Sequence, residues 1–199
     1  MSNYTESIEK LIEKLIKLPG IGRRSAERIV GHILNMPKEE VKSLAESIFR
    51  TKQSVRLCRI CNNLSEQDTC RICQDLRRQN DIICVVEKPS DVTAIEKAGS
   101  FQGVYHVLLG SIAPLEGRGP GDLKIENLIA RLKENNIKEV IIATDADTEG
   151  ETTALYLTKV LKPSGVKLTR IGMGIPMGSN LEYADSSTLS RAMESRREI

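Results

Sequence analysis

The stretch CRICNNLSEQDTCRIC spans residues 58–73 and holds two Cys-X-X-Cys pairs with eight residues between them. Each pair can turn on itself so that both sulfurs point at one centre, and two pairs then surround a tetrahedral ion. Zn²⁺ prefers this geometry in structural sites, where no coordination position stays open for chemistry. The spacing therefore predicts a structural zinc site whose ligands are Cys58, Cys61, Cys70 and Cys73. Disulfides are disfavoured, because nothing in the sequence resembles an export signal.

This stretch also divides the chain into halves of opposite charge. The whole chain has a formal net charge of +2, but residues 1–80 carry 15 Lys and Arg against 10 Asp and Glu, whereas residues 81–199 carry 14 against 17. A basic first half favours an anionic partner. Aromatic residues are scarce, which argues against binding single strands by stacking bases on rings. The sequence has neither a signal peptide nor an apolar run of membrane-spanning length, so we expect a soluble, cytoplasmic protein.

Residues 18–29, LPGIGRRSAERI, connect two predicted helices in the basic half. Proline ends the first helix, and the two glycines let backbone N–H groups at the start of the second helix approach a phosphate. The stretch resembles a helix-hairpin-helix motif, which holds the phosphate backbone without reading sequence. The alternative is a simple turn between two packed helices. The resemblance implies DNA binding by these residues: Pro19, Gly20, Ile21, Gly22, Arg23, Arg24 and Arg28.

A third predicted helix, over residues 37–55, leads to the cysteines. Its apolar spacing predicts a buried face that includes Leu44, Ile48 and Phe49. Basic residues around the cysteines either extend a DNA-facing surface or form a solvated rim, and the sequence leaves both open: Lys52, Arg56, Arg59, Arg71, Arg77 and Arg78.

The second half alternates strands and helices. Strands are expected at residues 82–86, 104–109, 140–143 and 166–171, with helices at 90–98, 125–132 and 151–161. This alternation predicts an α/β fold whose parallel sheet carries helices on both faces. Cys84 lies inside the first strand as a core residue, and His106 is a residue of the second strand and not a catalytic group.

Acidic residues follow two of these strands. Glu87 comes directly after the first, and Asp145, Asp147 and Glu149 lie in the turn DADTEG after the third. Ligand sites in parallel sheets lie beyond the carboxyl ends of the strands, and carboxylates suit Mg²⁺. The alternative is that these residues cap a helix and favour its dipole. A glutamate followed by DxD resembles the Toprim domain, which implies a possible Mg²⁺ site at Glu87, Asp145 and Asp147.

From about residue 8 to the C-terminus, the chain resembles the RecR family of bacterial recombination mediators. The matching strings include CVVEKPSDV at 84–92, YHVLLGSIAPLEGRGPGDL at 105–123 and LEYADSSTLSRAMESRRE at 181–198. The resemblance implies a helix-hairpin-helix module at residues 1–56, a four-cysteine zinc finger at 57–79, a Toprim domain at 80–175 and a subunit-contacting tail at 176–199.

The family resemblance also implies a function. It predicts a non-catalytic DNA clamp of recombinational repair, located with the bacterial nucleoid, that forms a ring-like homotetramer and acts with RecO and RecF to load RecA on gapped single-stranded DNA. Glu87, Asp145, Asp147 and Glu149 would contact RecO. The alternative is a Mg²⁺-dependent Toprim enzyme on DNA, a nuclease or a topoisomerase-like protein. None of the four tyrosines has a recognisable nucleophile setting: Tyr4, Tyr105, Tyr156 and Tyr183.

Overall fold

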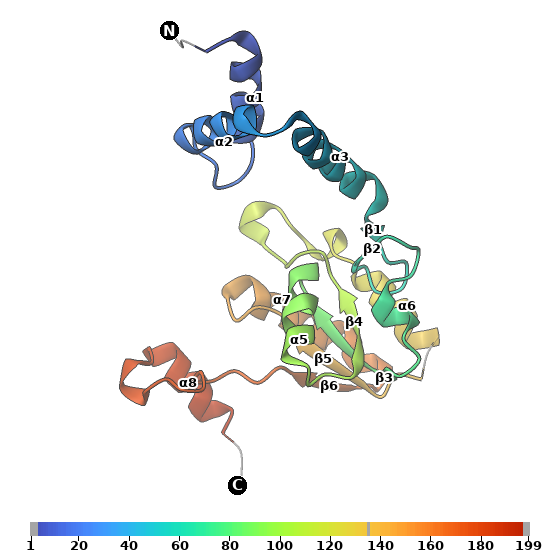
Figure 1. The fold of residues 1–199 in the computed structure, drawn as a ribbon. Helices are drawn as coiled ribbons and strands as arrows, with labels where there is room; N and C mark the ends of the chain where they lie inside the picture. The colour runs from blue at the N-terminus through green and yellow to red at the C-terminus, as the bar shows by residue number, and fades with distance from the viewer. Residues whose placement is uncertain (1–3, 135, 197–199) are drawn as a thin grey trace. The chain divides into compact units, whose positions relative to one another are not determined.

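A computed structural model describes residues 4–134 and 136–196 of the chain. The chain divides into two compact units, Met1–Ser54 and Val55–Ile199 (Figure 1). Among the described residues, no helix combines the length and the apolar character needed to cross a membrane.

The first unit is helical, as predicted. Helices α1 (Glu6–Ile16) and α2 (Arg23–Asn35) pack against each other, and α3 (Lys38–Ser54) follows. The α1–α2 pair has a small core of Ile12, Ala26 and Val30, which partly buried residues surround. The turn between the two helices is therefore fixed by apolar contacts on either side of it.

The prediction that α3 has a buried face was wrong. The helix has no buried residue, and Leu44, Ile48 and Phe49 are 46%, 66% and 63% exposed. The apolar spacing is real, but α3 packs on neither α1 nor α2 closely enough to cover it. Within the first unit, this face is therefore left uncovered.

The second unit begins with the zinc knuckle, which we define as residues 55–75. Two short strands, β1 (Arg56–Leu57) and β2 (Leu64–Ser65), pair antiparallel, and helix α4 (Arg71–Gln74) closes the segment. Asn62 adopts a left-handed conformation with φ of 60° immediately after the first cysteine pair. The knuckle is thus a hairpin followed by one helical turn.

The four-stranded sheet of this unit is parallel throughout, as the sequence predicted. Its order is β4 (Gly103–Val107), β3 (Gln79–Val86), β5 (Glu139–Ala143) and β6 (Lys167–Arg170). Because β3 and β5 are central neighbours, the residues that follow them emerge side by side at the carboxyl edge of the sheet. This topology brings Glu87 close to the turn that begins at Asp145.

Helices cover both faces of the sheet (Figure 1). One face packs on α6 (Ile125–Glu134) and α7 (Thr148–Leu161), and the other on α5 (Pro89–Ala98), whose N-cap is Lys88. Cys84 is a core residue of the second face, as predicted. Single 3₁₀ turns occur at Pro114–Glu116, Pro120–Asp122, Lys162–Ser164 and Leu181–Tyr183.

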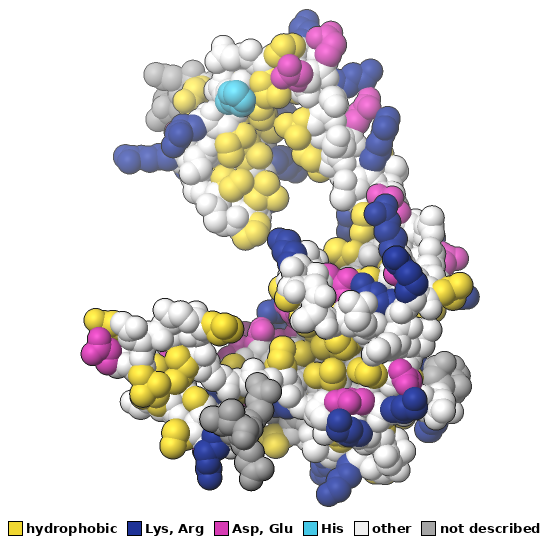
Figure 2. Space-filling model, turned by 60° about the horizontal axis from the view of Figure 1, so that its bottom comes forward, with side chains coloured by type: hydrophobic (Ala, Val, Ile, Leu, Met, Phe, Trp, Pro, Cys, Tyr) yellow, Lys and Arg dark blue, Asp and Glu magenta, His cyan; other side chains and the backbone are white. Residues whose placement is uncertain are grey.

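The C-terminal segment, residues 171–196, ends in α8 (Ser186–Glu194). Asp185 caps this helix by accepting hydrogen bonds from the hydroxyl and N–H groups of Ser187 and Thr188, and these bonds, those of the hydroxyls first, hold the pKa of its carboxyl well below the usual range. Hydrophobic side chains gather on the surface of the segment (Figure 2), including Met177 and Tyr183, which are 103% and 79% exposed.

Candidate functional site

The four cysteines of the knuckle come together as a metal-ligand set. Their Sγ atoms all lie within 4.8 Å of one another, and those of Cys61 and Cys70 are 3.5 Å apart. Tetrahedral coordination with Zn–S bonds of about 2.3 Å places sulfurs roughly 3.8 Å apart. Three of the cysteines are buried and Cys73 is partly so. The number, chemistry and spacing of these donors fit Zn²⁺, as the sequence predicted.

The electrostatics of the cluster also favour a cation. Hydrogen bonding among the thiols raises the pKa of Cys61 to about 12 and raises that of Cys73 still further, because neighbouring sulfurs cannot all lose their protons at short range. The N–H of Cys70 lies 3.3 Å from Cys58 Sγ, within hydrogen-bond distance for sulfur. A divalent cation removes the repulsion by binding all four as thiolates.

The knuckle is bound to the edge of the sheet. The N–H of Val107 on β4 donates to the carbonyl of Cys61 at 2.8 Å, and the Asn62 amide donates to the carbonyl of Val107 at 3.2 Å. The neighbouring His106 is fully buried, and its Nε2 lies 2.8 Å from the carbonyl oxygen of Lys124. Burial lowers the pKa of His106 to about 4, so this histidine is neutral and structural. The prediction that His106 is a residue of the second strand is confirmed, since it lies within β4.

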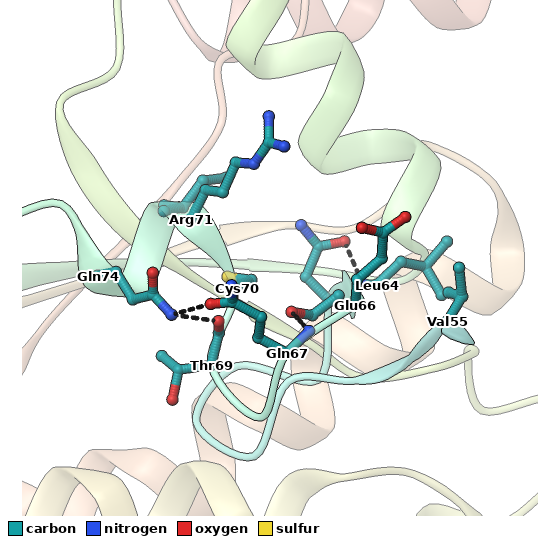
Figure 3. Close-up of a pocket in the computed structure, with 11 residues that line it drawn as sticks. Val55, Leu64, Glu66, Gln67, Thr69, Cys70, Arg71 and Gln74 are labelled. Carbon is teal, nitrogen blue, oxygen red and sulfur yellow. Dashed lines mark hydrogen bonds between the residues drawn. The ribbon is translucent and has the colours of Figure 1, made fainter. Parts of the chain in front are cut away.

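A pocket of about 560 Å³ opens on the knuckle (Figure 3). The Gln74 amide donates to Gln67 Oε1 at 3.0 Å and to the carbonyl of Thr69 at 2.7 Å. Arg71 lines the pocket but extends away from these groups (Figure 3). Because these polar groups form hydrogen bonds with one another, they contribute to the internal hydrogen bonding of the knuckle.

Half of the basic residues near the cysteines have carboxylate partners within the second unit. Arg56 pairs with Asp68 at 3.1 Å, Arg77 pairs with Asp75 at 2.8 Å, and Arg78 pairs with Glu96. The side chains of Arg59 and Arg71 are exposed and have no partner in the described part of the chain. The open question between a DNA-facing surface and a solvated rim therefore narrows to those two residues in this unit.

The hairpin turn has the features of an anion site. Gly20 adopts φ of +79°, which a side chain disfavours, and Gly22 is the N-cap of α2 without any side-chain cap. The first turn of α2 contains no acidic residue. The N–H groups of this first turn and the positive end of the helix dipole are therefore not neutralised by a carboxylate of the same turn. A Cβ built on Gly22 meets nothing within 4 Å, so internal packing does not require glycine there.

The three arginines beside this turn differ. Arg23 donates to both carboxylate oxygens of Glu9 at 3.0 and 3.1 Å and to Glu27 at 3.1 Å, so it joins α2 to α1. These bonds, that to Glu9 first, raise the pKa of Arg23. Arg24 and Arg28 are exposed, and neither has an ion-pair partner among residues 4–134 and 136–196. Arg24 and Arg28 are therefore the cations available to an external phosphate.

The carboxyl edge of the sheet brings Glu87 and Asp145 into contact. Glu87 is only 2% exposed and accepts a hydrogen bond from the N–H of Asp145 at 3.0 Å. Burial raises the pKa of the Glu87 carboxyl, and the nearby Asp145 and Asp147 add to the shift. The exposed Asp145 carboxylate lies 3.5 Å from the Lys88 ammonium. A buried, perturbed carboxyl at a strand end is typical of a functional position.

The other acidic residues do not complete a ligand set. Asp147 is the N-cap of α7 and accepts a hydrogen bond from the N–H of Gly150 at 2.8 Å. This is the helix-capping role that the sequence left open as the alternative to metal binding. In the described ranges, 4–134 and 136–196, the four cysteines form the only cluster of three or more metal-ligating side chains. The aspartates therefore lie at the predicted carboxyl edge of the sheet, but they do not converge with a third carboxylate to form a metal-ligand set.

Comparison with known proteins matches four family descriptions in sequence order. They are the RecR helix-hairpin-helix at residues 8–51, the RecR four-cysteine zinc finger domain at 55–75, the Toprim domain at 81–172 and the RecR C-terminal region at 174–197. Proteins named Recombination protein RecR from two strains of Clostridium perfringens are 50% identical to the chain, and one from Pelotomaculum thermopropionicum is 51% identical, each over the full length of both chains.

The chain belongs to the RecR family. It is a recombination protein with a DNA-binding hairpin module, a zinc finger and a Toprim domain, and the buried cysteine cluster is the zinc-binding part of that RecR finger. The sequence prediction of the family and of the fold is confirmed.

Two charged residues of this RecR chain with structural contacts were not predicted from the sequence. Glu151 lies between Arg170 at 3.0 Å and Arg191 at 2.5 Å, and so joins α8 to α7. Arg131 on α6 donates to the carbonyl of Tyr105 at 2.6 Å beside the knuckle. Glu151 stands one helical position beyond the DADTEG motif and Arg131 lies on an amphipathic helix, so no local signal separated either residue from ordinary surface charge.

Proposed function

We propose that the chain is a non-catalytic DNA clamp and mediator of recombinational repair. In this proposal it binds DNA backbones through the hairpin, assembles as a ring-like homotetramer, and acts with RecO and RecF to promote loading of RecA on gapped single-stranded DNA in the bacterial cytoplasm, at the nucleoid. The four parts proposed are residues 1–56, 57–79, 80–175 and 176–199.

The observation that carries the proposal is the hairpin turn. An uncapped helix start, a glycine whose missing Cβ serves no internal packing, and the exposed cations Arg24 and Arg28 stand within one short stretch. Together they suit a phosphate, and phosphate contacts hold DNA without regard to sequence. The remaining residues of the proposed DNA site are Pro19, Gly20, Ile21 and Arg23. The first three shape the turn, and Arg23 holds α2 against α1 through its ion pairs.

The acidic turn supports the proposed contact with RecO. Asp145 and Asp147 are exposed, Glu149 is partly exposed, and all three stand close together in the chain at one edge of the sheet. Glu87 lies beneath them, so its part is to hold the turn through the Asp145 N–H. A surface of this kind suits a basic partner through complementary charge.

Assembly is supported by the apolar side chains that one chain leaves uncovered. The face of α3 with Leu44, Ile48 and Phe49 is exposed, and so are Met177, Leu181 and Tyr183 on the C-terminal segment. Contiguous exposed apolar residues on a soluble chain are typical of subunit contacts. We propose that copies of the chain cover both surfaces in the tetramer.

A second candidate is a Mg²⁺-dependent enzyme on DNA. The observation that favours it is the buried Glu87 beside Asp145, since a carboxyl with a raised pKa can serve as a general acid or base. Mg²⁺ typically binds one or two carboxylates with waters and phosphates, so Asp145 and Asp147 could still bind it with DNA present. The capping role of Asp147 favours the clamp.

The test of DNA binding replaces Arg24 and Arg28 together by Gln. Anisotropy of a labelled gapped duplex is measured over a series of salt concentrations, with Lys42→Gln/Arg50→Gln as a control of equal charge; both control residues pair with Glu46 on α3. We expect the slope of log K against log salt to fall by about 0.9 for each phosphate that the variant no longer neutralises. Affinity should fall roughly two- to fivefold per arginine, from about 0.5–1 kcal/mol each. An unchanged slope in the hairpin variant, or an equal change in the control, would remove the hairpin from the DNA site.

A further inference from the structure

The zinc cluster has a charge that its own segment does not balance. Four thiolates around one Zn²⁺ leave two negative charges in excess. Cys58, Cys61 and Cys70 are 0%, 1% and 4% exposed, so water reaches them poorly. A buried net charge is costly unless an opposite charge or hydrogen bonds compensate it. The site therefore calls for a cation close to the sulfurs and shielded from solvent.

Of the three arginines of the knuckle, Arg56 is paired with Asp68, and the other two do not meet that need well. Arg59 and Arg71 each follow the first cysteine of a pair, but both side chains are exposed. The attraction between an exposed cation and a buried anion is weakened by solvent and salt. A cation inside the fold has a much stronger effect at the same separation.

Arg131 has the required location. It is partly buried on α6 and lines a pocket of about 510 Å³ together with Cys73 and Arg59, and α6 lies beside the knuckle in Figure 1. Its Nη1 donates to the carbonyl of Tyr105 on β4 at 2.6 Å. Two residues further along the same strand, Val107 binds the carbonyl of Cys61. The strand that holds the knuckle thus also holds the guanidinium.

The electrostatics agree with this geometry. Burial lowers the pKa of Arg131, and the four cysteines, Cys73 most strongly, act in the opposite direction. The attraction is mutual, so a guanidinium stabilised by thiolates also stabilises those thiolates.

We propose that Arg131 is a positioning residue of the zinc centre, whose partly buried guanidinium balances the charge of the zinc-bound thiolates. The zinc site then extends beyond the finger match at 55–75 into the region matched by the Toprim domain at 81–172. Zinc binding and the docking of the knuckle on the sheet become one event, since α6 and β4 supply the compensating charge.

The test compares zinc affinity in Arg131→Gln, Arg131→Lys and the control Arg59→Gln, all in the full chain. Affinity is measured by competition with a chromophoric zinc chelator, and Cys58→Ser is the variant that lacks a ligand. Partners of metal ligands typically contribute about 10–100-fold in metal affinity, which is the loss we expect for Arg131→Gln. Arg131→Lys keeps the charge and should stay within about threefold of the wild type, as should Arg59→Gln.

Equal losses in the Gln and Lys variants would overturn the charge role and leave only the hydrogen bond to Tyr105. Wild-type affinity in Arg131→Gln would overturn the proposal altogether. If Arg131→Gln does not fold with stoichiometric zinc, it is refolded with increasing free zinc. Recovery at about 10–100-fold higher zinc would support the proposal, and failure at every zinc concentration would contradict it.

Discussion

Replacing Gly150 by Ala tests the turn that holds the acidic residues. A Cβ on Gly150 would lie 2.1 Å from the carbonyl oxygen of Asp145 and 2.8 and 2.9 Å from its carbonyl carbon and nitrogen. Non-bonded heavy atoms prefer separations of about 3.5–4.0 Å, so the backbone of Asp145 must retreat by more than about 1 Å. No side-chain rotation relieves the clash, because all three atoms belong to the backbone.

Several energies combine in this substitution. Overpacking of this kind costs about 1–3 kcal/mol. Displacing the turn also weakens the cap from Asp147 to the Gly150 N–H, which contributes about 1 kcal/mol. The greater helix propensity of Ala returns at most about 1 kcal/mol. We therefore expect Gly150→Ala to lower the free energy of unfolding of the second unit by roughly 1–4 kcal/mol.

The assay is urea unfolding followed by circular dichroism, with Gly172→Ala as the control. Gly172 belongs to the same unit, and a Cβ there meets nothing within 4 Å. With a slope of about 2 kcal/mol per molar urea, the Gly150→Ala midpoint should fall by about 0.5–2 M, while the control stays within about 0.5 kcal/mol of the wild type. A wild-type midpoint for Gly150→Ala would refute the reasoning, since it would mean that the turn relaxes without cost.

The remaining predictions concern the same edge of the sheet. Burial raises the pKa of Glu87 in the folded state, so the wild type should lose stability relative to Glu87→Gln as pH rises through that raised pKa, and the two proteins should be equally stable below the unfolded pKa of about 4.3. Urea midpoints of both proteins at about pH 4 and about pH 7 measure this change. An equal difference between the two midpoints at both pH values would count against it. Charge reversal by Glu149→Lys should reduce RecO capture in a pull-down at least about fivefold while leaving the unfolding midpoint unchanged, and full capture would exclude this surface as the RecO contact.

Much of this architecture could be predicted because its causes are local. The doubled cysteine spacing allows few geometries, and continuous apolar runs such as residues 82–86 fit only strands covered on both faces. The alternation of strands and helices then leaves little choice but a parallel sheet with acidic residues at its carboxyl edge.

Other features depend on contacts between distant segments. Arg23 pairs with Glu9, which is fourteen residues away, only because α1 and α2 pack together. Asp147 could have been a metal ligand or a helix cap, and the choice depends on the start of α7. The apolar spacing on α3 led to a wrong prediction of burial, because periodicity alone cannot tell whether another part of the chain covers an apolar face.

The most direct test of the account asks whether the chain changes DNA or only binds it. Purified protein is incubated with supercoiled and single-stranded DNA and Mg²⁺, beside a Glu87→Ala/Asp145→Ala variant whose binding is checked by anisotropy. The clamp account predicts that both proteins bind and that neither nicks, relaxes nor joins the DNA. Any such change that the wild type produces and the double variant does not would contradict the account and assign Mg²⁺-dependent catalysis to this site.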